Sequence, residues 1–133
     1  MLVLDTSAAL TVLAAGDPPR ELVERLAGDG DLHGPHLLDT EMLHAVRWLT
    51  ARGDLSEERA ADVLYDFSEL ALVRYPHWPL KERVWELRHN LTAYDATFVA
   101  LAELLDVPLL TCDSRLAAAP AHRARVEYFA PGS

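Results

Sequence analysis

The chain has 133 residues and half of them are hydrophobic, which suits one compact domain with a buried core and excludes a wholly disordered chain. Its 21 acidic residues against 12 basic ones give a net charge of -9, which excludes a protein that binds nucleic acid through a broad basic surface. The only cysteine, Cys112, excludes an intrachain disulfide and fits a reducing compartment, so we expect a cytoplasmic protein.

Short apolar runs alternate along the chain with segments of helical spacing. In chain order, the pattern predicts a strand over 2–5, helices over 6–13 and 19–27, a turn at 28–30, a strand over 31–34, helices over 36–51 and 56–67, a strand over 70–75, a loop at 76–79, helices over 80–89 and 93–105, a strand over 108–112, a helix from 114 and an edge strand over 126–129. The apolar runs are far shorter than the roughly 18 to 20 residues of a membrane helix, so no membrane association is expected.

Strands separated by helices are typical of a parallel sheet that helices cover on both faces, because right-handed crossovers put the connecting helices there. The sequence therefore predicts an α/β fold of three layers, α/β/α, around a central, mainly parallel sheet. Residues 1–133 contain no repeat or linker, so we expect them to form a single domain.

Acidic residues follow two of the predicted buried strands at the point where each strand ends. Asp5 follows the first strand, and Asp113 follows the strand before the last predicted helix. In such sheets ligands bind beyond the carboxyl ends of the strands, which makes both acids candidate site residues. The alternative is that each acid only caps the next helix. Hydroxyls at the two junctions, on Thr6, Ser7 and Ser114, can supply those caps, so helix initiation alone does not require the acids.

Two further acids lie on the inward faces of predicted helices. Glu41 has apolar neighbours on both sides in the helix over 36–51, so its carboxylate must be paired, protonated or bound to a metal. A buried ion pair with an arginine is the alternative. Asp95 lies in the same way on the helix over 93–105, where its alternative is a capping box with Thr92, although Glu or Gln is usual at that position.

Together these four acids can converge on one end of the sheet. Carboxylates at close range raise one another's pKa, and a divalent cation removes that penalty. Four carboxylates without a cysteine make a hard oxygen site, for which Mg²⁺ or Mn²⁺ is the natural occupant. These ions keep several waters and bind phosphate oxygens, so the chemistry best served is hydrolysis of a phosphodiester by an activated water.

Three segments resemble those of the PIN-domain nucleases, in particular the VapC-type toxins of bacterial toxin-antitoxin pairs. They are the opening at 2–8, the stretch 35–47 around Glu41, and the block 91–116 with its two acidic motifs, TAYDA and LLTCDSRL. The resemblance covers essentially the full chain and implies a single PIN domain over 1–133. It also implies a catalytic and metal-binding quartet of Asp5, Glu41, Asp95 and Asp113. Hydroxyls that orient these carboxylates are implied at Thr6, Ser7 and Thr111.

The resemblance further implies a function. It predicts a Mg²⁺-dependent (or Mn²⁺-dependent) endoribonuclease toxin that cuts structured RNA, tRNA or rRNA, and so blocks translation. It also predicts a homodimer that is silenced by a cognate VapB-type antitoxin. One alternative is a PIN-like interaction module without catalysis. A second is a phosphatase of the haloacid-dehalogenase type, but that class needs a second acid where this chain has Ser7, and a downstream lysine, for which Lys81 is the only candidate.

The remaining polar and aromatic residues give weaker signals. Four arginines are candidate contacts to RNA phosphates, although a solvated helix face explains each equally: Arg47, Arg83, Arg88 and Arg115. Three tryptophans could stack on bases, but their spacing among leucines favours packing in the protein: Trp48, Trp78 and Trp85. His36 and His44 lie near Glu41 without the spacing of paired ligands, so we expect them to be surface or core residues.

Overall fold

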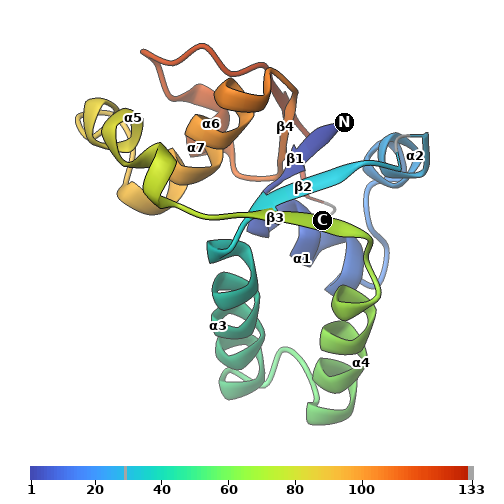
Figure 1. Cartoon of the computed structure of the whole chain (residues 1–133). Helices are drawn as coiled ribbons and strands as arrows, with labels where there is room; N and C mark the ends of the chain where they lie inside the picture. The colour runs from blue at the N-terminus through green and yellow to red at the C-terminus, as the bar shows by residue number, and fades with distance from the viewer. Residues whose placement is uncertain (29, 132–133) are drawn as a thin grey trace.

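The computed structural model describes residues 1–28 and 30–131, so Asp29 of the predicted turn at 28–30 lies outside the described residues. The strands, shown in Figure 1, are β1 (Leu2–Leu4), β2 (Leu32–Pro35), β3 (Leu72–Tyr75), β4 (Leu109–Thr111) and β5 (Val126–Tyr128). The helices are α1 (Thr6–Ala14), α2 (Arg20–Gly28), α3 (Leu37–Ala51), α4 (Glu57–Ser68), the 3-10 helix η1 (Trp78–Leu80), α5 (Lys81–Glu86), α6 (Ala93–Leu105) and α7 (Ser114–Ala118). Every predicted strand and helix is present. The main difference is η1, which occupies part of the predicted loop at 76–79.

The five strands form one sheet in the order β3-β2-β1-β4-β5, and every neighbouring pair is parallel. The central strand is β1, where Val3 lies opposite His33 of β2 and Leu109 of β4. All residues of β1 and β4 are buried, as expected for strands covered by helices on both faces. The prediction of a mainly parallel sheet within an α/β fold is therefore confirmed.

The direction in which the chain crosses the sheet reverses between β1 and β4. From β1 the chain steps outward to β2 and β3, and it then returns past β1 to β4 and β5. Because parallel crossovers are right-handed, helices of the first run cover one face and helices of the second run cover the other. Accordingly, α1 packs with α3 and α4, while α6 packs on β1, β2 and β4 (Figure 1). Ligands of such sheets bind at this reversal, beyond the carboxyl ends of the strands.

Helix α6 lies within the core. All residues from 96 to 102 are buried, so the prediction that this helix is covered nearly all round is confirmed for its middle turns. The helix begins where the Thr92 hydroxyl accepts the N–H of Asp95 at 3.1 Å. It ends at Asp106, which adopts a left-handed conformation with φ of 54°. No helix among the described residues has both the length and the apolar character needed to cross a bilayer.

The prediction that three tryptophans pack inside the protein is wrong. Trp48, Trp78 and Trp85 are 51, 75 and 67 % exposed. The physical reason is that α3 extends past the sheet on which it packs (Figure 1), Trp78 lies in the short helix η1, and α5, which carries Trp85, has no buried residue, so these rings have no core to enter. The guanidinium groups of Arg52 and Arg88 lie over the exposed rings of Trp48 and Trp85, at 4.3 and 4.4 Å from the ring centroids.

A buried ion pair joins α5 to α6. Nε and Nη2 of Arg83 donate to the two carboxylate oxygens of Glu103 at 2.7 and 3.0 Å. The side chain of Glu103 is 5 % exposed and also accepts the backbone N–H of Arg123 at 2.6 Å. Burial raises the pKa of Glu103, but the hydrogen bonds from Arg83 and Arg123 outweigh it and hold that pKa below its ordinary value.

Removal of Arg83 leaves the Glu103 carboxylate buried with only the weaker contacts from Arg123. We therefore expect Arg83→Ala to lower the free energy of unfolding by about 2 kcal/mol, measured by urea denaturation at pH 7. Arg20→Ala is the matched control, because the pair of Arg20 with Glu24 is 90 and 61 % exposed and should contribute less than about 0.5 kcal/mol. Equal losses in the two variants would contradict the role of the buried pair.

Candidate active site

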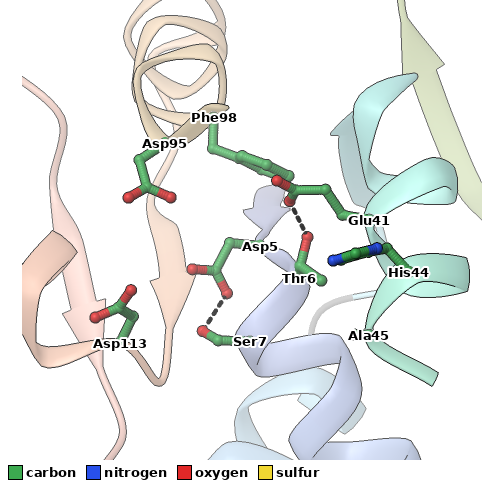
Figure 2. Close-up of a pocket in the computed structure, with 9 residues that line it drawn as sticks. All are labelled: Asp5, Thr6, Ser7, Glu41, His44, Ala45, Asp95, Phe98 and Asp113. Carbon is green, nitrogen blue, oxygen red and sulfur yellow. Dashed lines mark hydrogen bonds between the residues drawn. The ribbon is translucent and has the colours of Figure 1, made fainter. Parts of the chain in front are cut away.

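A pocket of about 300 Å³ opens at the carboxyl ends of β1 and β4. Each of the four predicted acids contributes to its wall, and each comes from a different part of the fold: the β1–α1 junction, α3, α6 and the β4–α7 junction (Figure 2). The residues that line it are Asp5, Thr6, Ser7, Glu41, His44, Ala45, Asp95, Phe98 and Asp113. The structure therefore brings together side chains that the sequence separates by up to 108 positions.

Asp5 is the most buried acid of the pocket, at 4 % exposure. One of its oxygens, Oδ1, accepts the N–H of Ala8 at 2.8 Å and the hydroxyl of Ser7 at 2.7 Å. The other oxygen, Oδ2, accepts the hydroxyl of Thr111. Burial nevertheless dominates and raises the pKa of Asp5 to about 6, against the lowering effect of these donors.

The hydroxyls of Ser7 and Thr111 also join the two strand ends. Ser7 Oγ accepts the N–H of Cys112 at 2.9 Å, and Thr111 Oγ1 accepts the N–H of Asp113 at 3.0 Å. Both hydroxyls donate to Asp5, so each bridges the β1–α1 junction to the β4–α7 junction. The expected hydrogen bonds between hydroxyls and carboxylates are present here, and they fix the orientation of the Asp5 carboxylate.

Glu41 projects from α3 toward the pocket and is half-buried. Its Oε1 accepts the hydroxyl of Thr6, as Figure 2 shows. Burial raises the pKa of Glu41, the hydrogen bond from Thr6 lowers it, the charge of Asp95 raises it further, and His44 lowers it. Among the described residues no arginine pairs with Glu41, so the predicted alternative of a buried ion pair is wrong.

Asp95 and Asp113 complete the acidic wall. Figure 2 shows both carboxylates facing the one of Asp5. Burial raises the pKa of Asp95, and the neighbouring charge of Asp113 raises it further, while Arg115 lowers it. The backbone N–H of Asp95 is held by Thr92 at 3.1 Å, so one half of the predicted capping box is present while the carboxylate lines the pocket.

The expectation that hydroxyl residues cap α1 and α7 is wrong. Asp5 is itself the N-cap of α1, and Asp113 is the N-cap of α7, where Oδ1 accepts the N–H of Arg115 at 2.9 Å. The capping and site interpretations of these acids are thus compatible, because a carboxylate has two oxygens and can cap with one while the other faces the pocket. The hydroxyls of Thr6 and Ser7 bind carboxylates instead.

The donor set of this pocket suits a hard divalent cation. It offers carboxylate and hydroxyl oxygens, and the negative charge of a neighbouring acid adds to burial in raising the pKa of Asp5, Glu41 and Asp95. Among the described residues, no three acid, histidine or cysteine side chains lie close enough to hold one ion as they stand. Mg²⁺ commonly uses only one or two carboxylates and keeps several waters, so the pocket fits a hydrated ion.

Of the four arginines predicted to contact phosphate, only Arg115 lies beside the acidic wall. Its side chain is exposed and its Nε lies 3.8 Å from Oδ1 of Asp113. The guanidinium group of Arg83 forms the ion pair with Glu103, and the guanidinium group of Arg88 lies over the ring of Trp85. Arg47 is exposed and does not belong to the pocket wall.

Three residues that line the pocket are not among the site residues predicted from the sequence: His44, Ala45 and Phe98. His44 is exposed, as expected, but it lies at the pocket rather than elsewhere on the surface. The spacing of His44 indicates this place, because residues three and four apart share one face of a helix and His44 follows Glu41 by three. Phe98 follows Asp95 by the same interval.

Comparison with known proteins identifies relatives over most of the chain. Residues 2–121 match the PIN domain family. Ribonuclease VapC1 of Mycobacterium tuberculosis is 47 % identical over 119 residues, which cover 89 % of this chain and 90 % of VapC1. The structure of Rickettsia felis VapBC2, bound to a DNA fragment from its promoter, matches with a TM-score of 0.71 at 14 % identity over 96 % of this chain and 97 % of that one. Mycobacterium tuberculosis VapC20, a sarcin-ricin loop cleaving toxin, matches with a TM-score of 0.63 at 19 % identity over 89 and 94 % of the two chains.

The raised pKa of Asp5 predicts an unusual dependence of stability on pH. Between about pH 4 and pH 6 the folded chain binds more protons at Asp5 than the unfolded chain does, so this stabilising contribution is complete below pH 4 and is lost as the pH rises through about 6. In the absence of divalent metal, protonation of Asp5 should make the free energy of unfolding of the wild type higher at pH 5 than at pH 7.5. In Asp5→Asn we expect this increase to be smaller by about 1 kcal/mol. Urea denaturation in EDTA at both pH values measures this, and an unchanged increase would show that Asp5 titrates normally.

Proposed function

The chain belongs to the PIN domain family and, within it, to the VapC proteins, and from this premise we propose that it is a Mg²⁺-dependent endoribonuclease, the toxin of a toxin-antitoxin pair. The observation that carries the proposal is the pocket itself. Four acids from four elements line it at the reversal point of the sheet, and burial and like charge raise the pKa of three of them. Such an arrangement is costly for the isolated fold and is typical of a functional site.

Asp5, Glu41, Asp95 and Asp113 are the residues that would hold Mg²⁺ or Mn²⁺. When bound, the ion would supply Lewis-acid activation of a water and positive charge beside the scissile phosphate. The chain's own hydroxyls keep the carboxylates in place for this role: Ser7 and Thr111 bind the two oxygens of Asp5, and Thr6 binds Glu41. This support leaves the carboxylates of Asp5 and Glu41 little freedom to turn away from the pocket.

For the substrate we propose structured RNA of the translation apparatus, tRNA or rRNA, whose cleavage would block protein synthesis. Support comes from VapC1, which is named a ribonuclease, and from VapC20, whose description names cleavage of the sarcin-ricin loop. The acidic pocket needs a cation to accept a phosphodiester, because RNA phosphates and four carboxylates repel one another. This requirement is consistent with a nuclease that depends on metal.

For the partners we propose a cognate VapB-type antitoxin and a second copy of this chain, in the cytoplasm, where translation takes place. The structurally similar VapBC2 of Rickettsia felis supports an antitoxin partner. Large apolar side chains stay exposed on the described surface, which supports contacts with other chains. They include Leu43, Trp48, Trp78, Trp85 and Leu104.

The phosphatase alternative loses support from the geometry. At the position where that class needs a second acid, Ser7 instead donates its hydroxyl to Asp5 at 2.7 Å. Lys81 lines a different hollow, with Trp85 and Arg88, and not the acidic pocket. A PIN-like interaction module without catalysis is the remaining alternative, and measurements of RNA cleavage and of metal binding separate it from an enzyme.

The first experiment tests cleavage. With Mg²⁺ and total RNA from a bacterial lysate, we expect the wild type to produce discrete new 5′ ends, mapped by sequencing of RNA ends. Asp5→Asn and Asp95→Asn should each lower the cleavage rate at these sites about a hundredfold or more, since each removes charge that positions the ion. Asp62→Asn, at an exposed acid of α4, is the control and should cleave like the wild type. Equal rates in all four proteins would refute the assignment.

The second experiment tests metal binding. Isothermal titration with Mn²⁺ should show binding to the wild type, and added Mg²⁺ should raise its melting temperature, because a ligand that binds only the folded state stabilises it. In Glu41→Gln and Asp113→Asn we expect weaker binding and a smaller thermal shift. Absence of Mn²⁺ or Mg²⁺ binding to the wild type would favour the interaction module over the nuclease.

A further inference from the structure

The acidic pocket has almost nothing with which to hold a phosphate directly. Its four acids can only accept hydrogen bonds when ionised, and Ala45 and Phe98 are apolar. The hydroxyls of Thr6 and Ser7 already donate to Glu41 and Asp5. Among the residues of this wall, His44 therefore has the only side-chain donor that is not already given to a carboxylate.

The side chain of His44 is also accessible to a ligand. Its side chain is exposed and makes no hydrogen bond to any other described residue. Figure 2 shows the ring reaching from α3 toward Thr6 at the side of the pocket. An imidazole has one N–H donor when neutral and two when charged, so it can bind a phosphate oxygen in either form. No change of protonation is needed for this contact.

A second hollow adjoins the pocket at the same residue. It has a volume of about 440 Å³ and lies between α3 and the start of α6. Its wall consists of Leu37, Thr40, Glu41, His44 and Tyr94. Glu41 and His44 line both hollows, so a chain that occupies the pocket and continues into the second hollow must pass His44.

We propose that His44 binds a backbone phosphate of the RNA strand at the place where the strand leaves the acidic pocket for the hollow beside Tyr94. The proposal rests on the ribonuclease function proposed above and adds a substrate-binding residue to it. Glu41, in contrast, faces the same strand with a negative charge and repels it unless a cation is bound. His44 thereby gives the strand a point of attachment that belongs to the protein itself.

The test compares His44→Ala, His44→Gln and His44→Glu on a short RNA hairpin that carries a cut site mapped for the wild type. A hydrogen bond to a charged phosphate that is present before and during cleavage should act mainly on KM. We expect KM to rise about tenfold in His44→Ala, and more in His44→Glu, which adds a negative charge, with kcat changed less than about threefold. His44→Gln keeps an N–H donor and should recover most of the loss.

Two controls distinguish phosphate binding by His44 from a general effect of losing a histidine and from metal binding. His89→Gln changes an exposed histidine outside both hollows and should leave KM unchanged. Mn²⁺ titration of His44→Ala should give the affinity of the wild type, and a tenfold weaker affinity would make His44 a metal ligand and overturn the proposal. An unchanged KM in His44→Ala, or no recovery in His44→Gln, would also overturn it. If the wild type itself cleaves no RNA, the proposed function fails, and the proposal for His44 falls with it.

Discussion

The burial of one carboxylate, that of Asp5, constrains the whole arrangement of this protein. A buried carboxylate is tolerated only where hydrogen bonds replace its lost water, and Asp5 has three such donors, from Ser7, Ala8 and Thr111. The first two belong to α1 and the third to β4, so the group is satisfied only when β1, α1 and β4 are all in their native places. Ser7 and Thr111 each accept an N–H from the segment after β4, which closes the network.

The reversal of strand order explains why four distant acids can meet there. The first run of crossovers places α3 with Glu41 on one side of the sheet, and the second run places α6 with Asp95 on the other. Both helices approach the same end of the neighbouring strands β1 and β4, and the junctions after these strands carry Asp5 and Asp113. The acids thus surround the pocket from two layers and two strand ends, an arrangement that no single element could supply.

The charge balance of the chain has a clear structural basis. Many arginines are occupied by acids at the surface or at its edge, so little positive charge is left to form a basic face. Such pairs include Arg20 with Glu24, Arg25 with Glu127, Arg52 with Asp54, Arg74 with Asp39, Arg83 with Glu103, and Arg125 with Asp106. The acids of the pocket lack such partners among the described residues, apart from the distant contact of Asp113 with Arg115. Negative charge is therefore concentrated where a cation would have the strongest effect.

The sequence by itself determined the order and type of the elements, the parallel sheet and the four acids that line the pocket, because apolar periodicity and strand-end acids are local signals. It did not determine which group caps α1 and α7, since Asp and Ser are almost equivalent caps and only the partners present in space decide between them. The prediction that Trp48 packs inside the protein is wrong because periodicity shows which face of a helix is apolar but not where the helix extends beyond its neighbours. The sequence also assigned His44 no special place, although its spacing from Glu41 was visible. Only tertiary structure showed that the hydroxyls of Thr6 and Ser7, the other neutral side-chain donors of the pocket wall, are already given to carboxylates, because hydrogen-bond partners between distant segments are a property of the packed fold.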